Sequence, residues 1–303
     1  MKNSWVNRDI ISITDFSKDD LLFAIKTAES LKKQTRPTLL TGSMMGSCFF
    51  EPSTRTRLSF ESAMQRLGGS VVGFPDPNVT STKKGETLAD TIRIVGQYVD
   101  IIVVRHPLEG AARRAAEATE KPIINAGDGA NQHPTQTLLD LFTIKETQKT
   151  LTDLHITMVG DLKYGRTVHS LAQALKYFNA RLSFVSPQTL SMPEHICDEL
   201  KQAGIKFSFH ASIEEVINTT DILYMTRIQE ERFPDKIEYE RVKNAYVLTA
   251  EMLSTGKKTL RILHPLPRVQ EIHPEVDATP YAYYFEQAKN GLFVRQALLG
   301  LVL

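Results

Sequence analysis

Short apolar runs that alternate with helical patterns are the feature that most constrains the fold of this chain. The runs have the length and composition of buried strands, and amphipathic stretches follow most of them. The apolar runs are 44–50, 70–74, 100–105, 122–125, 155–160, 180–185, 205–210, 221–226 and 260–264. The helical stretches are 18–34, 55–68, 86–98, 109–119, 134–147, 166–178, 193–203, 212–218 and 281–303. This order predicts an α/β fold with two parallel sheets, each flanked by helices.

The length of 303 residues suggests about two domains. The expected parts are a first domain (1–133), an interdomain helix (134–150), a second domain (151–285) and a C-terminal helix (286–303) that packs back on the first domain. Ligands of open parallel sheets bind beyond the carboxyl ends of the strands. We therefore expect the active site in the cleft between the two domains.

The charge balance excludes several classes of partner. Lys and Arg number 36 against 35 Asp and Glu, so a net charge of +1 provides no global field for nucleic acid or for a membrane surface. No stretch approaches roughly 18 uncharged apolar residues, and the first residues lack a signal-peptide core. Two cysteines, Cys48 and Cys197, are too few for a disulfide or zinc framework. We expect a cytoplasmic protein without a metal.

The segment EPSTRTR (51–57) follows the first apolar run and opens a helix. A helix N-terminus presents unpaired N–H groups, which makes it a natural site for phosphate. The hydroxyls of Ser53, Thr54 and Thr56 add donors, and the guanidinium of Arg55 matches the geometry of a phosphate. The alternative is an ordinary helix cap formed by Ser53, with arginines in solvent.

Two further segments of the first half place polar side chains after apolar runs. Arg105 ends the run 100–105, and it lies either at the ligand-binding edge of the sheet or on the plain surface. His133 stands at the start of the helix 134–147, with Gln136 one turn further on. A helix N-terminus favours a neutral imidazole, which can donate one hydrogen bond. The alternative is a buried capping histidine beside an exposed glutamine.

The loop 75–86 is polar and is expected to contain no helix or strand of its own. It carries Ser81, Lys83 and Lys84, which can pair with an anion. Such a loop is more often a solvated surface, so its role stays open.

The segment GDLKYGRT (160–167) resembles a nucleotide-binding loop but has Arg166 where a phosphate-binding lysine is required. A P-loop hydrolase is therefore disfavoured, and no dinucleotide fingerprint is present.

Arg227 opens a long loop (227–234) that is either a mobile lid or a plain charged loop. In HPLPR (264–268), the two prolines make the backbone rigid and leave carbonyls that can accept a hydrogen bond from a ligand amide. The alternative is a rigid turn without a binding role. Arginines after four runs indicate a small ligand with several negative charges: Arg55, Arg105, Arg166 and Arg227.

Three motifs together resemble the aspartate/ornithine carbamoyltransferase family: STRTR (53–57), HPTQ (133–136) and HPLPR (264–268). The resemblance covers nearly the whole chain. Ornithine-specific members are similar to one another in a Ser-Met-Gly loop and a His-Cys-Leu-Pro segment, whereas this chain has MTRIQ (225–229) and HPLP (264–267). The resemblance therefore implies carbamoyl transfer from carbamoyl phosphate to the α-amino group of L-aspartate, a step of pyrimidine synthesis that needs no cofactor.

The resemblance also implies which residues hold carbamoyl phosphate. Its phosphate is expected to bind the start of the first helix motif, through Ser53, Thr54, Arg55 and Thr56. Together with Arg55, the donors to its carbonyl oxygen are the expected catalytic residues: Thr56, Arg105 and His133. Its amide is expected to donate to Gln136 and to the backbone carbonyls of Pro265 and Leu266.

A further set is implied for aspartate, for domain closure and for assembly. The aspartate carboxylates are expected to bind Lys84, Arg166, Arg227 and Gln229. Ser81 and Lys84 are expected to come from the neighbouring subunit of a homotrimer and to bind carbamoyl phosphate there. Glu51 with Arg166 and Arg232 resembles a bridge that holds the domains closed. A separate regulatory chain in a larger allosteric assembly is a further partner that the resemblance suggests.

Two other functions stay open at this point. One is carbamoyl transfer to an ornithine-type or other amine acceptor. The other is a non-catalytic protein that binds phosphate metabolites.

Overall fold

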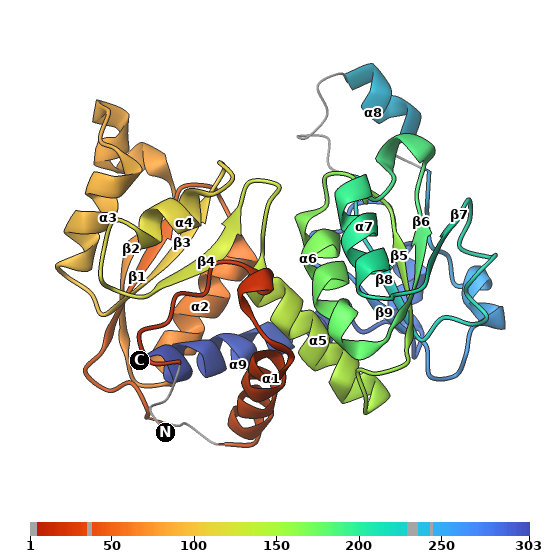
Figure 1. Ribbon diagram of the computed structural model, residues 1–303, viewed down its shortest axis with the longest axis horizontal. Helices are drawn as coiled ribbons and strands as arrows, with labels where there is room; N and C mark the ends of the chain where they lie inside the picture. The colour runs from red at the N-terminus through yellow and green to blue at the C-terminus, as the bar shows by residue number, and fades with distance from the viewer. Residues whose placement is uncertain (1–4, 35–37, 229–235, 243–244) are drawn as a thin grey trace. The chain divides into compact units, whose positions relative to one another are not determined.

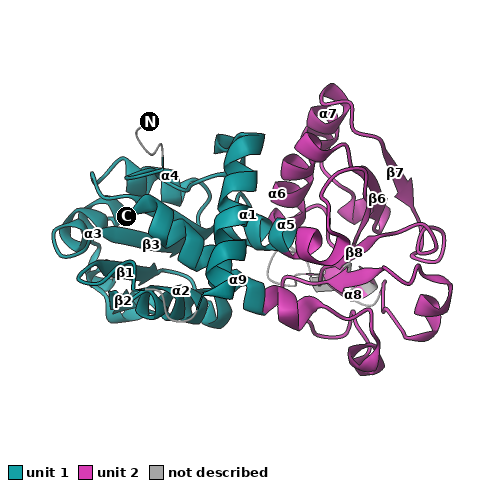
Figure 2. Cartoon of the chain, turned by 90° about the horizontal axis from the view of Figure 1, so that it is seen from below, with its two compact units in different colours: residues 1–142, 289–303 teal, residues 143–288 magenta. Residues whose placement is uncertain are grey.

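The computed structural model describes residues 5–34, 38–228, 236–242 and 245–303. The chain forms two compact units, residues 1–142 with 289–303 and residues 143–288 (Figure 2). Two helices, α5 (Pro134–Gln148) and α9 (Tyr284–Val302), contain residues of both units.

The first unit contains a four-stranded parallel sheet in the order β2-β1-β3-β4 (Figure 1). Its strands are β1 (Met44–Phe49), β2 (Ser70–Phe74), β3 (Ile101–His106) and β4 (Ile123–Asp128). The buried apolar runs of β1, β3 and β4 are typical of strands that are covered on both faces. All four strands end at the same edge, so the segments after them are brought together.

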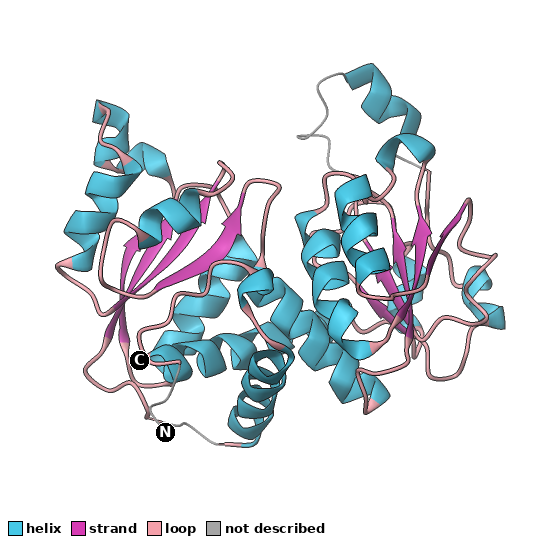
Figure 3. Cartoon of the chain, in the orientation of Figure 1, coloured by secondary structure: helices cyan, strands magenta, loops and turns pink. Residues whose placement is uncertain are grey.

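Helices cover both faces of this sheet (Figure 3). The helices of the unit are α1 (Lys18–Lys33), α2 (Thr54–Arg66), α3 (Leu88–Gly96) and α4 (Ala111–Ala116), with parts of α5 and α9. Cys48 packs in one apolar cluster with Ile92 of α3 and Ala112 of α4. Its neighbour Ser47 points to the opposite face, where its hydroxyl donates to Glu61 Oε1 of α2 at 2.9 Å. Alternation along β1 thus separates the two helical layers.

Arg295 of α9 is a buried cation in the first unit, with 4% of its surface exposed. Its Nη1 donates to the Ser59 hydroxyl of α2 at 3.0 Å, and its guanidinium lies 5.0 Å from the ring centroid of Phe60. Burial lowers the pKa of Arg295 to about 10, and the negative charge of Asp140 on α5 opposes that shift. The C-terminal helix therefore helps to fix α2.

The second unit contains a five-stranded parallel sheet in the order β7-β6-β5-β8-β9. Its strands are β5 (His155–Val159), β6 (Arg181–Val185), β7 (Phe207–His210), β8 (Ile222–Met225) and β9 (Arg261–Leu263). Helices α6 (Arg166–Leu175) and α7 (Glu194–Gln202) lie side by side, and α8 (Lys236–Val242) is a short additional helix (Figure 1). The two parallel sheets confirm the predicted α/β fold.

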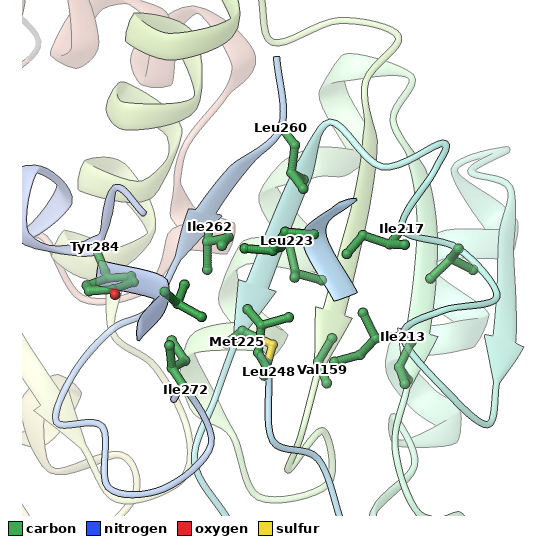
Figure 4. Packing of buried hydrophobic residues seen from close by; sticks show 14 residues of the cluster. Val159, Ile213, Ile217, Leu223, Met225, Leu248, Leu260, Ile262, Ile272 and Tyr284 are labelled. Atoms are coloured by element: carbon green, nitrogen blue, oxygen red, sulfur yellow. The ribbon is translucent and has the colours of Figure 1, made fainter. Parts of the chain in front are cut away.

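An apolar cluster in the second unit joins the sheet to segments without regular helix (Figure 4). Val159, Leu223 and Met225 of the strands pack there with Ile213 and Leu248. Burial of apolar surface by irregular segments stabilises the sheet as burial by a helix would.

Two sequence-based expectations are wrong. Residues 212–218 form turns rather than a helix, because the Val216 and Ile217 N–H groups both donate to the Ile213 carbonyl and no helical ladder follows. The apolar spacing that suggested a helix arises because these side chains enter the core. The loop 75–86 contains two short 3₁₀ helices, Pro77–Val79 and Ser81–Lys84, whose starts are capped by Asp76 and Thr80.

Among the described residues, none of the helices combines the length and the apolar character that a membrane span requires.

Candidate active site

The N-terminus of α2 follows the carboxyl end of β1. Ser53 occupies the cap position, yet its side chain makes no capping hydrogen bond within the described part of the chain. By contrast, the hydroxyls of Ser17 and Thr87 accept from backbone N–H groups at the starts of α1 and α3. Ordinary capping therefore explains the position of Ser53 but not the orientation of its hydroxyl. Thr56 is buried, whereas Thr54 is exposed.

The two arginines of this segment have different surroundings. Arg57 Nε lies 3.8 Å from Glu61 Oε1, one turn further along α2, which is an ordinary helical ion pair. Arg55 is exposed beside the helix start. Arg57 thus pairs along the helix, and Arg55 lies in the first turn, where the helix presents its N–H groups.

Arg105 is fixed between the ends of two strands. It pairs in register with Phe49 of β1, and its side chain is 12% exposed. Its Nη2 lies 3.1 Å from Glu51 Oε2, and its Nη1 donates to the Ala126 carbonyl of β4 at 3.2 Å. The guanidinium is therefore oriented from both sides at the carboxyl edge of the sheet. Glu51, expected to pair with Arg166 and Arg232, forms this ion pair with Arg105, and Arg232 lies outside the described residues.

His133 is held at the start of α5 by a turn that Asp128 organises. Asp128 Oδ1 accepts from the Gln132 N–H at 3.1 Å and from Asn125 Nδ2 at 2.9 Å. The carbonyl of His133 accepts from the Thr137 N–H at 3.2 Å, and the residue is 5% exposed. Asp128 is not among the residues predicted from the sequence; its position three residues after the apolar run 122–125 was the available signal.

Gln136 lies on the first turn of α5 and is 8% exposed. Its Nε2 donates to Asp140 Oδ1 at 2.8 Å. Because Asp140 holds the amide nitrogen, the orientation of the amide is fixed and its oxygen is the atom presented on the other side. A ligand that meets that oxygen must donate to it.

Ser81 and Lys84 lie on the second 3₁₀ helix of the segment 75–86, and both are exposed. The helix ends at Gly85, whose φ of 90° lies in the left-handed region that favours glycine. Lys83 is also exposed on the same turn. In the single chain, these side chains face solvent.

In the second unit, Arg166 begins α6 after β5, and Arg227 follows the adjacent strand β8. Gly160, directly after β5, has a φ of 114°, and a Cβ there would lie 2.3 Å from the Thr226 carbonyl oxygen. Glycine therefore lets the two loops approach closely. This close approach explains the glycine that made the segment 160–167 look like a nucleotide-binding loop. Gln229 lies outside the described residues.

Pro265 and Leu266 follow β9, which neighbours β8, and both are partly buried. Leu266 has a φ of 53° and a cis peptide bond to Pro267. Arg268 of the same motif donates to Asp277 and to the Tyr284 hydroxyl. The hydrogen bond from Arg268 lowers the pKa of Asp277. Arg268 thus supports the loop. The carbonyls of Pro265 and Leu266 are the groups of this loop that can bind a ligand.

Among the described residues, no group of three or more His, Cys, Asp or Glu side chains is arranged to hold a metal ion.

Two family models match the chain. Residues 8–146 match the carbamoyl-P binding domain of aspartate/ornithine carbamoyltransferase, and residues 152–302 match its Asp/Orn binding domain. The aspartate carbamoyltransferase catalytic subunit 2 of Shewanella halifaxensis is 58% identical over 304 residues, which cover 100% of this chain and 98% of that protein.

Solved structures give the same result. The catalytic subunit of M. jannaschii aspartate transcarbamoylase is 49% identical, with a TM-score of 0.90 and 97% of each chain covered. Aspartate transcarbamoylase from Trypanosoma cruzi, in complex with carbamoyl phosphate and aspartate, is 39% identical with a TM-score of 0.95. That match covers 99% of this chain and 98% of the Trypanosoma cruzi chain.

Proposed function

Because this chain belongs to the aspartate/ornithine carbamoyltransferase family, we propose that the polar groups at the carboxyl ends of its two sheets bind carbamoyl phosphate and aspartate. The chain is a carbamoyltransferase with the aspartate activity of its relatives. It transfers the carbamoyl group of carbamoyl phosphate to the α-amino group of L-aspartate, and the products are N-carbamoyl-L-aspartate and phosphate. The activity expected from the three sequence motifs is confirmed.

The start of α2 is the observation that best supports the assignment of the phosphate site. Helix N–H groups, a serine hydroxyl that does not cap the helix, and the Arg55 side chain lie there together. We assign the phosphate of the substrate to Ser53, Thr54, Arg55 and Thr56. The carbamoyl amide is assigned to the oxygen of Gln136 and to the carbonyls of Pro265 and Leu266.

The mechanism follows from the charge that develops during the reaction. The aspartate amine attacks the carbonyl carbon, and the carbonyl oxygen becomes an oxyanion in the tetrahedral intermediate. Donors from Thr56, Arg105 and His133 stabilise that oxyanion, and the ion pair with Glu51 keeps Arg105 oriented. The bond from carbon to the phosphate oxygen then breaks, and the leaving phosphate takes the proton of the amine. Binding both reactants in one orientation lowers the entropic barrier.

We assign the aspartate carboxylates to Arg166, Arg227, Gln229 and Lys84. Arg166 and Arg227 follow neighbouring strands, and Gly160 allows their loops to approach each other. Guanidinium groups match carboxylates in geometry and charge, and they repel a cationic acceptor such as ornithine. Domain closure by Glu51, Arg166 and Arg232 is part of the same proposal.

Arg227→Ala should raise the KM for aspartate about tenfold, because the variant loses a charge-assisted contact with a carboxylate. The affinity for carbamoyl phosphate should stay unchanged, since that ligand is assigned to other residues. Steady-state kinetics with each substrate varied in turn measures both effects. Arg114→Ala, an exposed arginine of α4, is the matched control and should behave as the wild type. Equal weakening of both substrates would give Arg227 a structural role instead.

We further propose that the active unit is a homotrimer in which Ser81 and Lys84 act in the site of a neighbouring subunit. Both side chains are exposed on a short 3₁₀ helix in the single chain, as a contribution to a partner requires. The bacterial relatives are named catalytic subunits, which supports assembly with a separate regulatory chain.

The two free cysteines, Cys48 and Cys197, are both buried, which suits the reducing cytoplasm that we propose as the location.

A further inference from the structure

The loop 264–271 after β9 holds an unusual backbone conformation. Leu266 has a φ of 53°, in the left-handed region. An aliphatic residue rarely adopts that region, and such a conformation persists only where the surrounding structure determines it. The carbonyls of Pro265 and Leu266, which we assign to the carbamoyl amide, are carried by this same stretch of backbone. What holds Leu266 in place therefore also aims these carbonyls.

The imidazole of His264 is the first group that holds the loop. The Leu266 N–H donates to His264 Nδ1 at 2.8 Å. A backbone N–H can only donate, so Nδ1 carries no proton and the neutral ring must carry its proton on Nε2. That Nε2 lies 2.7 Å from Glu271 Oε1. His264 is 2% exposed, and its own N–H donates to Gln287 Oε1 at 2.8 Å.

The carboxylate of Glu271 is the second group. It is 8% exposed, and its Oε2 accepts from the N–H groups of Val269 and Gln270, each at 3.0 Å. With His264, three donors thus meet one acceptor-only group. Burial would raise the pKa of Glu271, but the hydrogen bond from His264 and the backbone N–H groups hold it below its usual value. The carboxylate closes residues 264–271 into a ring of hydrogen bonds.

We propose that His264 and Glu271 are positioning residues for carbamoyl transfer, because together they hold the Pro265 and Leu266 carbonyls in the orientation that receives the carbamoyl amide. The inference rests on the proposed function of these carbonyls. A site whose carbonyls accept from an NH₂ group discriminates against a ligand that has a methyl group at that place. Acetyl phosphate is such a ligand, so it reports on the alignment of the carbonyls.

The test compares Glu271→Gln and His264→Ala with the wild type. The glutamine amide places a donor against the existing donors, and the alanine removes the acceptor for the Leu266 N–H. We expect kcat/KM for carbamoyl phosphate to fall about tenfold in both variants. The ratio of the affinity for carbamoyl phosphate to the affinity for acetyl phosphate should fall by a similar factor. Inhibition by inorganic phosphate should stay unchanged, since phosphate carries no amide.

Two control variants separate alignment from general damage. Glu275→Gln changes an exposed glutamate nearby, whose Oε1 accepts from the Ala250 N–H at 2.9 Å, and it should behave as the wild type. His264→Asn keeps an oxygen that can accept from the Leu266 N–H, but its side chain is too short for its amide to donate to Glu271 at the same time. The loss of activity should therefore be smaller than that of His264→Ala.

The outcomes distinguish this inference from the proposed function. If the wild type forms no carbamoyl aspartate, the proposed function fails. If the wild type is active and prefers carbamoyl phosphate, but Glu271→Gln and His264→Ala keep that preference within twofold, only the positioning role is overturned. ¹⁵N NMR of the wild type gives a test that needs no variant to fold. A proton on Nε2 of His264 is expected, and a proton on Nδ1 would overturn the inference.

Discussion

Arg55→Ala should weaken the binding of carbamoyl phosphate and of inorganic phosphate together, by about 1.5–3 kcal/mol, which is roughly a 10- to 150-fold loss of affinity. The reason is that both ligands present a phosphate to the N-terminus of α2, where Arg55 supplies a charge-assisted hydrogen bond. Arg55 is exposed in the single chain, so we do not assign it the larger value of a buried ion pair. Competitive inhibition by phosphate and the Kd of carbamoyl phosphate measure the effect.

Arg57→Ala is the matched control for this variant. Arg57 lies two residues further along the same helix and forms an ion pair with Glu61. Its loss should cost a small amount of helix stability and leave phosphate inhibition unchanged. If phosphate inhibits Arg55→Ala as strongly as it inhibits the wild type, the placement of the phosphate site is contradicted.

Mixing two inactive variants, Lys84→Ala and His133→Ala, should restore activity to about a quarter of the wild-type sites. A restored site needs two intact residues from two different chains. Its His133 comes from a Lys84→Ala chain, and its Lys84 comes from a neighbouring His133→Ala chain. In a random equimolar mixture each condition holds for half of the chains, so a quarter of the sites satisfy both. This count assumes a cyclic trimer, which has one active site at each of its interfaces. Activity before and after subunit exchange measures the recovery.

The controls define what a negative result means. Lys83→Ala changes the adjacent exposed lysine of the same 3₁₀ helix and should stay active. Native mass spectrometry establishes that mixed trimers have formed. No recovery in proven mixed trimers would show that Lys84 acts within its own chain, and the shared site would have to be abandoned.

The strands were predictable from the sequence because buried parallel strands require continuous apolar runs. The runs 44–50 and 155–160 correspond to β1 and β5 within a residue at each end. The spacing of Ile213, Val216 and Ile217 is helical, yet the backbone hydrogen bonds of this segment form successive turns instead of a regular α-helix. Apolar spacing reports which side chains are buried, and it does not report whether the backbone continues as a helix.

The first contacts of the candidate site were easier to predict than the groups that support them. The hydroxyls and arginine at 53–56 stand out because they are consecutive and follow a strand. Asp128, Glu271 and Arg295 act through contacts that only the folded chain creates, and Arg295 meets Ser59 across 236 positions of sequence. No local pattern distinguishes such residues from surface charges.

The most direct test of the central claim is a turnover assay of the purified chain with carbamoyl phosphate and either L-aspartate or L-ornithine. We expect N-carbamoyl-L-aspartate and phosphate in equal amounts with aspartate, and no carbamoylated product with ornithine. Carbamoylation of ornithine in preference to aspartate, or binding of carbamoyl phosphate without any transfer to aspartate, would contradict it.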